Sequence, residues 1–200
     1  MKIPCSSCQA LIMTETAART GGLCMPCKSG TRADMEASKL AAKRERELDA
    51  TDPFRIYWRE LVDRVHGPSA GYSELSDSEW QYWAVGCVSG EVYNGGFHQY
   101  FHNSSGATYS AALDGFKAMG ALKSLLLLQK AKQMIFGFAD VPEDSCARRT
   151  MLVAAESDSL WQRLDELDKQ FWEDPDNLAV LSEQFAISCN LVKLAGSNVT

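Results

Sequence analysis

The most informative stretch of this chain is residues 91–106, which read EVYNGGFHQYFHNSSG. Two adjacent glycines, Gly95 and Gly96, separate two segments that are rich in aromatic residues. Glycine adopts backbone conformations that are costly for other residues, and it commonly stands where a helix ends. The stretch therefore predicts an elbow between two buried helices, with Phe97 and Tyr100 on the inner side of the second helix.

Apolar residues recur at helical spacing on both sides of this elbow. Ser76 and Glu79 fit a capping box that begins the helix before it, and Gly120 marks the end of a helix after it. No alternating strand pattern appears after residue 30, which predicts an all-α fold class: a compact multi-helix domain, preceded by a small N-terminal module and a connecting helix. In the strongly apolar helix expected over residues 121–138, we expect the buried side to consist of Leu122, Leu125, Leu126, Ala131, Met134 and Ile135.

The overall composition is that of a globular protein with acidic character. The chain has 200 residues, 46% of them hydrophobic, and a formal net charge of −6. This charge argues against bulk electrostatic binding to nucleic acid or to anionic membranes. The chain has no run near the roughly 18 apolar residues of a membrane span and no apolar segment of a secretory signal at its start, so we expect a cytoplasmic protein with reduced cysteines.

Four of the seven cysteines follow a metal-binding pattern. They are spaced as C-x2-C-x15-C-x2-C, which allows two tight turns to close a tetrahedral zinc site. The segment is too poor in apolar residues to fold unaided, so the metal would supply folding energy. Four thiolates leave no position for water, which indicates a structural zinc ribbon and not a catalytic site. The predicted zinc ligands are Cys5, Cys8, Cys24 and Cys27.

Composition divides the chain into three parts. Residues 1–32 form the predicted ribbon, residues 33–50 a charged linker helix, and residues 51–200 the all-α domain. The ribbon has four basic residues against one acidic residue and lacks aromatic residues for stacking on bases. We therefore expect the ribbon to contact protein. The alternative is a ribbon that binds nucleic acid directly, with the α domain serving for dimerisation.

Negative charge is concentrated in residues 140–183, which hold twelve acidic and four basic residues, a net charge of −8. Several of these acids are expected on the outer face of one amphipathic helix, where carboxylates three or four residues apart are neighbours. Such rows can bind a basic surface, although a plain solvated helix face is an equally good interpretation. The candidate partner-binding residues are Asp158, Asp165, Glu166, Asp168, Glu173, Asp174 and Asp176.

The sequence offers no credible catalytic site. It has no Walker, dinucleotide-binding or nucleophile-elbow motif. His98 and His102 are four residues apart and would share a helix face, where they could bind a metal or pair with Glu91, but paired histidines without a ligand are the favoured interpretation. The remaining thiols, at Cys87, Cys146 and Cys189, are expected to be inert core groups.

The stretch 91–106 also resembles a known family. It fits the pattern E-x-x-N-G-G-F-x-Q-[YF]-F-x-N-x-x-G, which is followed by A-L at residues 112–113 and M-G-A at residues 119–121. These motifs are similar to those of the bacterial DNA-mimic-protein-like domain family, and residues 164–171 resemble its acidic helix. The resemblance extends over about residues 51–194. It implies an all-α domain whose acidic surface occupies a DNA-binding partner in place of DNA, often as a dimer, or an immunity protein beside a toxin gene. The chain departs from the family pattern in its N-terminal ribbon and its milder charge.

Together these patterns predict a non-enzymatic inhibitor or regulator with a structural zinc ion. Its expected partner is a basic, nucleic-acid-handling protein, either a nuclease toxin or a transcription factor, and a homodimer is a further expectation. Residues 91–106 are interpreted as architecture. Only Asn94, Gln99 and Asn103, polar residues in an apolar setting, would be candidates for a binding site there if a pocket opened.

Overall fold

The computed structural model describes residues 1–67 and 74–194. Residues 68–73 and 195–200, which belong to the predicted 51–200 domain, lie outside the described residues. The backbone separates into two compact units, Met1–Ile56 and Tyr57–Thr200. Within the described residues, no helix is long and apolar enough to cross a membrane.

The first unit begins with a small cysteine module, residues 1–31. Strands β1 (Lys2–Pro4) and β2 (Leu11–Met13) form an antiparallel hairpin in which Ile3 pairs with Ile12. The hairpin is followed by two short helices, α1 (Thr14–Thr20) and α2 (Met25–Lys28). Helix α1 ends at Gly21, whose left-handed conformation (φ 69°) turns the chain toward the second cysteine pair.

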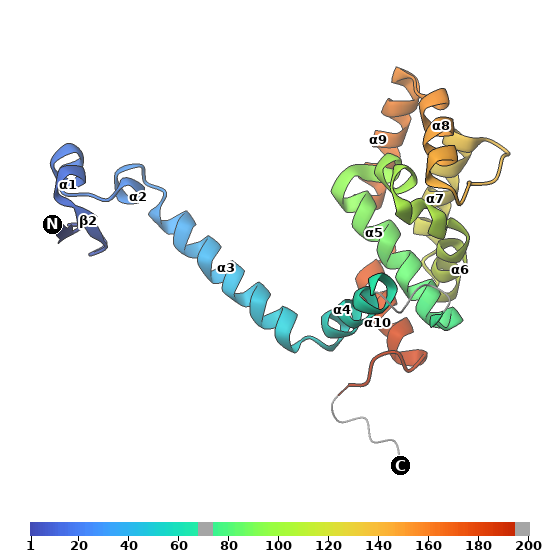
Figure 1. Ribbon diagram of the computed structural model, residues 1–200, viewed down its shortest axis with the longest axis horizontal. Coiled ribbons are helices and arrows are strands. Elements are labelled where there is room, and N and C mark those ends of the chain that lie inside the picture. The colour runs from blue at the N-terminus through green and yellow to red at the C-terminus, as the bar shows by residue number, and fades with distance from the viewer. Residues whose placement is uncertain (68–73, 195–200) are drawn as a thin grey trace, which may run out of the picture. The chain divides into compact units, whose positions relative to one another are not determined.

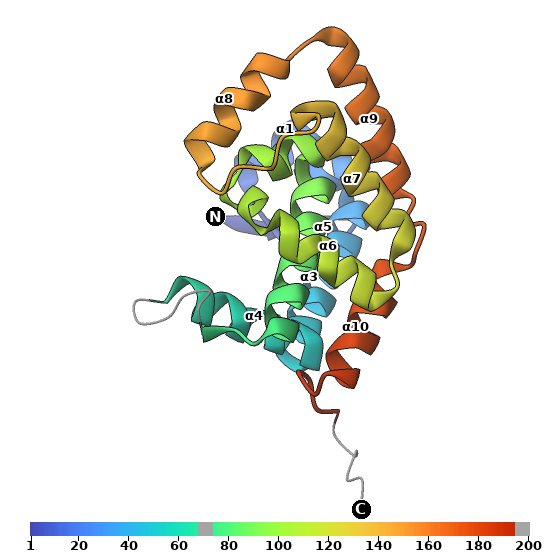
Figure 2. The same ribbon diagram turned by 90° about the vertical axis from the view of Figure 1, so that its right-hand side faces the viewer.

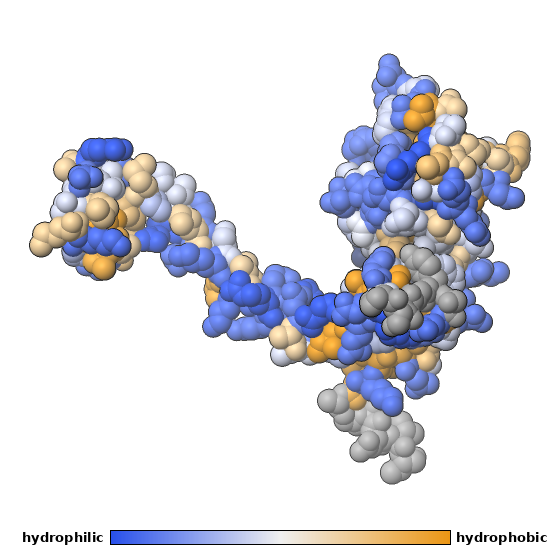
Figure 3. Space-filling view, in the orientation of Figure 1, coloured by the Kyte–Doolittle hydropathy of each residue, from blue (hydrophilic) through white to orange (hydrophobic). Residues whose placement is uncertain are grey.

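Helix α3 (Arg32–Thr51) is the predicted linker helix, and it has no buried residue. Its surface is mainly hydrophilic, as the blue colour along this segment shows (Figure 3). Ion pairs support it along its length, including Lys39 with Glu36 at 3.2 Å and Arg55 with Glu45 and Asp49, both at 2.8 Å. A helix that is polar all round depends on such pairs because it buries no apolar stripe.

The larger unit is all-α, as predicted, and α5 runs through its middle (Figures 1 and 2). Helix α5 contacts α6, α8, α9 and α10, so that it contributes many of the core side chains. The elements of this part of the chain are α4 (Pro53–His66), α5 (Asp77–His102), the 3-10 helix η2 (Ser104–Thr108), α6 (Tyr109–Met119), α7 (Leu122–Phe136), α8 (Ser145–Ala155), α9 (Asp158–Trp172) and α10 (Leu178–Ser188).

The predicted elbow lies inside α5. Gly95 (φ −163°, ψ 24°) and Gly96 (φ 78°, ψ 178°) interrupt the helical backbone, and helix resumes toward His102. The predicted capping box is also present, since Ser76 and Glu79 exchange side-chain to backbone hydrogen bonds at the start of α5. Beyond the elbow, Phe97, Tyr100 and Phe101 are fully buried.

The predicted inner face of α7 was right only in part: Ala131 and Ile135 are buried, and Leu125 and Met134 are half-buried. Leu122 and Leu126 are exposed, whereas Leu127, Leu128 and a serine, Ser124, are buried. Ser124 is buried because its N–H and hydroxyl both donate to the Asp176 carboxylate, at 2.7 and 2.9 Å. The buried side of α7 therefore differs in part from the face that hydrophobicity alone suggests.

Candidate metal centre and acidic helix face

The four N-terminal cysteines lie together in the cysteine module. Their sulfur atoms all fall within 4.8 Å of one another, with Cys5 and Cys24 buried and Cys8 and Cys27 half-buried. Among the described residues, no other group of three or more His, Cys, Asp or Glu side chains is arranged to hold a metal ion. The structure therefore brings together the ligand set that the spacing predicts.

Backbone hydrogen bonds hold both cysteine pairs in tight turns. The N–H of Cys5 donates to the carbonyl of Ala10 at 2.9 Å, and Gln9 takes the left-handed conformation (φ 62°) that returns the chain into β2. In the second pair, Cys24 is the N-cap of α2 and Cys27 lies within it, and the N–H of Lys28 donates to the carbonyl of Cys24 at 2.9 Å. Pro26 in the first turn of α2 has the fixed φ that a helix start requires.

Hydrogen-bond donors point at the sulfurs. The backbone N–H of Cys24 donates to Cys5 Sγ at 3.1 Å and lowers the pKa of Cys5 to about 6. The guanidinium of Arg32 donates to Cys8 Sγ and lowers the pKa of Cys8. Both contacts favour the thiolate, which is the form that binds metal.

The cluster fits a tetrahedral metal ion. Four thiolates at the usual Zn–S distance of about 2.3 Å are about 3.8 Å apart from one another in a regular tetrahedron. The Sγ atoms of Cys8 and Cys24 are 3.6 Å apart, close to this value. The module buries little apolar surface besides Ala17 and two of its cysteines, so a bound ion would contribute folding energy. Four thiolates would leave no coordination position open.

Helix α9 separates apolar and acidic residues onto opposite faces. Its buried stripe consists of Leu160, Leu164, Leu167 and Phe171. At 100° per residue, four exposed acids point away from this stripe, and we call them the α9 acidic face. The α9 acidic face consists of Asp158, Asp165 and Glu166 in the helix and Glu173, which is its C-cap.

The other three predicted partner-binding acids have internal contacts. Asp168 accepts a hydrogen bond from the backbone N–H of Phe97 at 2.8 Å. Asp174 accepts one from the N–H of Leu178 at 2.7 Å and caps α10, while Asp176 caps α7 through Ser124. These three carboxylates are half-buried and fix helix ends, whereas the α9 acidic face is available to a partner.

A half-buried hydrogen-bond network explains the polar residues of the 91–106 motif. Glu91 accepts from Gln99 Nε2 (2.7 Å), Asn103 Nδ2 (2.9 Å) and Ser105 Oγ (2.8 Å). The network joins the two halves of α5 across the elbow and continues into η2. Gln99 and Asn103 are thus satisfied inside the fold, and Asn94 is exposed.

Arg148 is a structural residue that the sequence did not reveal. Its side chain is fully buried and donates only to backbone carbonyls: Nε to Phe101 (2.7 Å) and the other nitrogens to Asn103 (2.6 Å), Pro142 (2.7 Å) and Glu143 (3.0 Å). Two of these carbonyls belong to the C-terminal end of α5, where a cation is favoured by the helix dipole. A Cβ at Gly106 would overlap the Arg148 side chain, which accounts for the last glycine of the motif.

The histidine pair forms no metal group in the described structure. The His98 ring packs against Trp161 in a tilted arrangement, with ring centroids 4.3 Å apart. Its Nε2 is 3.9 Å from Glu156 and is not paired with Glu91. Burial lowers the pKa of His98, which favours the neutral ring. Among the remaining thiols, burial raises the pKa of Cys87 to about 12, as expected for an inert group, but Cys146 is exposed, contrary to the prediction.

Fold and site together define an all-α domain with an acidic helix face, to which a four-cysteine module is attached. The family model described as "DMP19-like protein" matches residues 73–190. The chain therefore belongs to this family of DNA mimics, which confirms the resemblance seen in the 91–106 motif. Membership suggests a protein-binding role as a DNA mimic and indicates a group that is generally non-enzymatic. Comparisons with curated proteins and with solved structures gave no match.

Proposed function

We propose that this protein is a non-enzymatic DNA mimic that uses the α9 acidic face to occupy a basic, nucleic-acid-handling protein. The observation that supports this most strongly is the arrangement of α9, whose four exposed carboxylates lie opposite its buried stripe. Two partner classes suit this chemistry. The partner is a nuclease toxin, for which the chain would be the immunity protein, or a transcription factor that the chain would keep from DNA.

The carboxylates of this face are largely free to attract a partner. Asp165 pairs with Lys169 at 2.6 Å. Within the described part of the chain, Asp158, Glu166 and Glu173 form no ion pair at 4.0 Å or closer. Exposed negative charges that lack local partners are the groups that steer a basic protein and that lose influence in salt.

An aromatic side chain lies beside this face. Trp161 is 42% exposed although one side of its ring packs on His98. It is three residues after Asp158 and four before Asp165, so all three side chains are neighbours on the helix surface. Tryptophan is enriched among residues that dominate binding energy, so Trp161 supplies apolar contact area next to the charges.

The alternative, nucleic-acid reading by the cysteine module, has less support. The module, residues 1–31, carries a net charge of only +2, from three basic residues and Glu15, and contains no aromatic residue on which a base could stack. No contact in the described structure favours this alternative. The module is better explained as a metal-stabilised surface for protein contact.

The test is affinity capture from nuclease-treated lysate of the source cells with two matched variants. One removes three charges of the α9 acidic face (Asp158→Asn, Glu166→Gln and Glu173→Gln). The control removes three exposed charges elsewhere in the larger unit (Glu60→Gln, Asp63→Asn and Asp114→Asn), so both variants have the same net charge.

We expect the control to capture the same basic protein as the native chain and the α9 variant to bind it about tenfold more weakly, at about 0.5 kcal/mol per exposed charge. Circular dichroism melts of all three chains verify folding. Equal capture by the two variants would show that the α9 acidic face is not the binding surface.

A further inference from the structure

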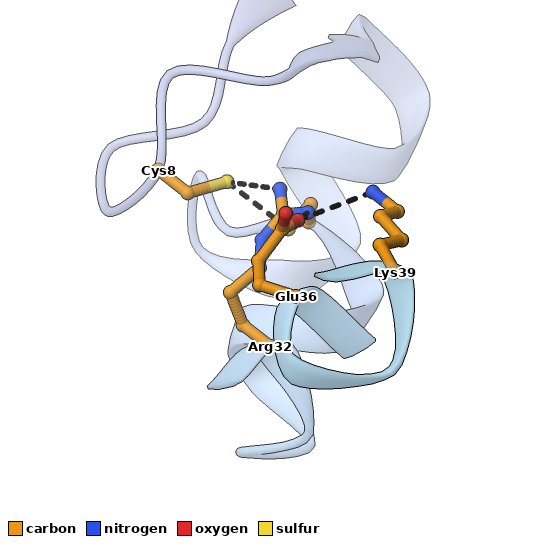
Figure 4. Close-up of polar contacts among 5 residues, drawn as sticks. Cys8, Arg32, Glu36 and Lys39 are labelled. Carbon is orange, nitrogen blue, oxygen red and sulfur yellow. Dashed lines mark hydrogen bonds and ion pairs between the residues drawn. The ribbon is translucent and has the colours of Figure 1, made fainter. Parts of the chain in front are cut away.

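Arg32 connects the cysteine cluster to the linker helix. It is the first residue of α3, and its side chain points back to the sulfurs (Figure 4). One guanidinium nitrogen donates to Cys8 Sγ and lies 3.8 Å from Cys24 Sγ. The other terminal nitrogen is 3.1 Å from Glu36 Oε1, on the next turn of α3.

Glu36 holds the arginine in this position. Its Oε1 also pairs with Lys39 Nζ at 3.2 Å, so the contacts run from Cys8 through Arg32 and Glu36 to Lys39 (Figure 4). Side chains from the first two turns of α3 are thus linked to the sulfur of Cys8.

Few other contacts fix the start of α3 to the cysteine module. The N–H of Thr31 donates to the carbonyl of Pro26 at 2.9 Å, and α3 buries no side chain. Because no residue of α3 is buried at this joint, the contact between the Arg32 guanidinium and Cys8 Sγ is the side-chain interaction that ties α3 directly to the cluster.

We propose that Arg32 is a positioning residue of the metal centre, through which metal binding fixes the first turn of α3 to the cysteine module. This rests on metal binding by the four cysteines. A divalent ion held by four thiolates has a net charge of −2, which a neighbouring guanidinium offsets while it donates hydrogen bonds to sulfur. Hydrogen bonds from outside the ligand set orient metal ligands, and their loss typically weakens metal binding about 10- to 100-fold. Without the ion, the sulfurs are no longer held together, and the acceptor for Arg32 is lost.

The first experiment uses the full chain, with Co²⁺ as a spectroscopic probe and a chromophoric chelator as a competitor for Zn²⁺. The variants are Arg32→Gln, Arg32→Lys and, as a matched control, Arg44→Gln, which removes the same charge from an exposed position on α3. Hydrogen bonding to a thiolate lowers the energy of the sulfur electrons. We therefore expect Arg32→Gln to move the sulfur-to-cobalt charge-transfer band to longer wavelength and to weaken Zn²⁺ binding about tenfold.

The control should match the native chain, and Arg32→Lys, which keeps the charge but loses the planar fork, should fall between native and Arg32→Gln. The proposal is overturned if Arg32→Gln has the native cobalt spectrum and binds Zn²⁺ within twofold of the control. If Arg32→Gln does not fold, Arg32→Lys decides: a displaced band supports the proposal, and a band identical to the native one overturns it.

The second experiment measures the coupling by hydrogen exchange of backbone amides 32–39 in metal-loaded and chelated native chain and in Arg32→Gln. Metal should slow exchange in this turn of the native chain and have a smaller effect in the variant. An equal metal effect in both would contradict the coupling. Absence of any tetrahedral thiolate spectrum in the native chain would instead refute metal binding, and would leave the acidic-face proposal unaffected.

Discussion

The backbone N–H of Phe97 donates a hydrogen bond to the carboxylate of Asp168 at 2.8 Å, across 71 residues of sequence. The donor is the first residue after the Gly95–Gly96 elbow, so an acid on the inner part of α9 caps the second half of α5. Helix α9 therefore has two roles in this fold: Asp168 and the buried stripe fix the elbow, and the α9 acidic face points outward.

The elbow requires glycine at position 96. Gly96 has φ 78° and ψ 178°, and a Cβ there would overlap the Asp168 carboxylate. We expect Gly96→Ala to lower the free energy of unfolding by about 2 kcal/mol, since this backbone region is nearly exclusive to glycine. Gly90→Ala is the matched control, because Gly90 is helical with no atom near its Cβ position, and it should raise stability by about 0.5 kcal/mol or leave it unchanged. Urea denaturation compares them, and equal effects would refute this account of the elbow.

Asp168 should make stability depend on pH. Burial raises its pKa to about 6, above the value of about 3.9 in an unfolded chain. Because the folded state binds this proton more tightly, the contribution of Asp168 falls as pH rises from about 4 to 6 and is constant above. Lowering the pH from 6 to 4 should therefore increase the stability of the native chain relative to Asp168→Asn. Parallel urea-denaturation profiles over this range would contradict the prediction.

The Glu91 network should affect stability and not partner binding. Glu91→Gln places an amide N–H₂ among the donors of Gln99, Asn103 and Ser105. Leaving polar groups of this half-buried network unpaired should lower the free energy of unfolding by about 1 kcal/mol. Glu60→Gln, at an exposed position, should change the free energy of unfolding by less than about 0.5 kcal/mol. Captured partner should be the same for both variants at a temperature where both are folded. Loss of capture by Glu91→Gln alone would make residues 91–106 part of the binding site.

Metal removal should unfold the cysteine module selectively. Chelation, or Cys27→Ser, should bring the exchange of backbone amides in residues 1–31 close to that of an unfolded chain, because the module has almost no core. Amides in the core of the larger unit should keep their protection. Elemental analysis should find one zinc ion per chain, and unchanged exchange in residues 1–31 after complete metal removal would contradict a structural metal.

The sequence predicted those features that depend on neighbours in the chain. The glycine pair and the Ser76 capping box determine local backbone geometry, and the cysteine spacing limits how the two pairs can meet. Contacts between distant segments were not predictable in this way. Asp176 accepts two hydrogen bonds from buried Ser124, a contact that hydrophobicity does not reveal, so the predicted face of α7 was right for Ala131 and Ile135 and wrong for Leu122 and Leu126.

The same limit applied to charged residues. From the sequence, Arg148 would be taken for a surface residue. Its burial depends on backbone carbonyl acceptors, which no pattern of side chains reveals. The sequence could not distinguish the capping acids Asp168, Asp174 and Asp176 from the acids that point outward. A carboxylate that caps a helix and one that contacts a partner have no different sequence pattern. Helical periodicity did place Asp158 and Asp165 opposite the leucine stripe, as the structure shows.

The central claim is that the α9 acidic face takes the place of DNA on its partner. The most direct measurement titrates duplex DNA into the purified complex of this protein with its captured partner, at constant ionic strength, and follows the release of the protein. Mimicry predicts that DNA displaces this protein completely from its partner. The apparent affinity of this protein for the partner should then fall in proportion to the free DNA concentration. A stable complex of partner, DNA and this protein together would contradict it.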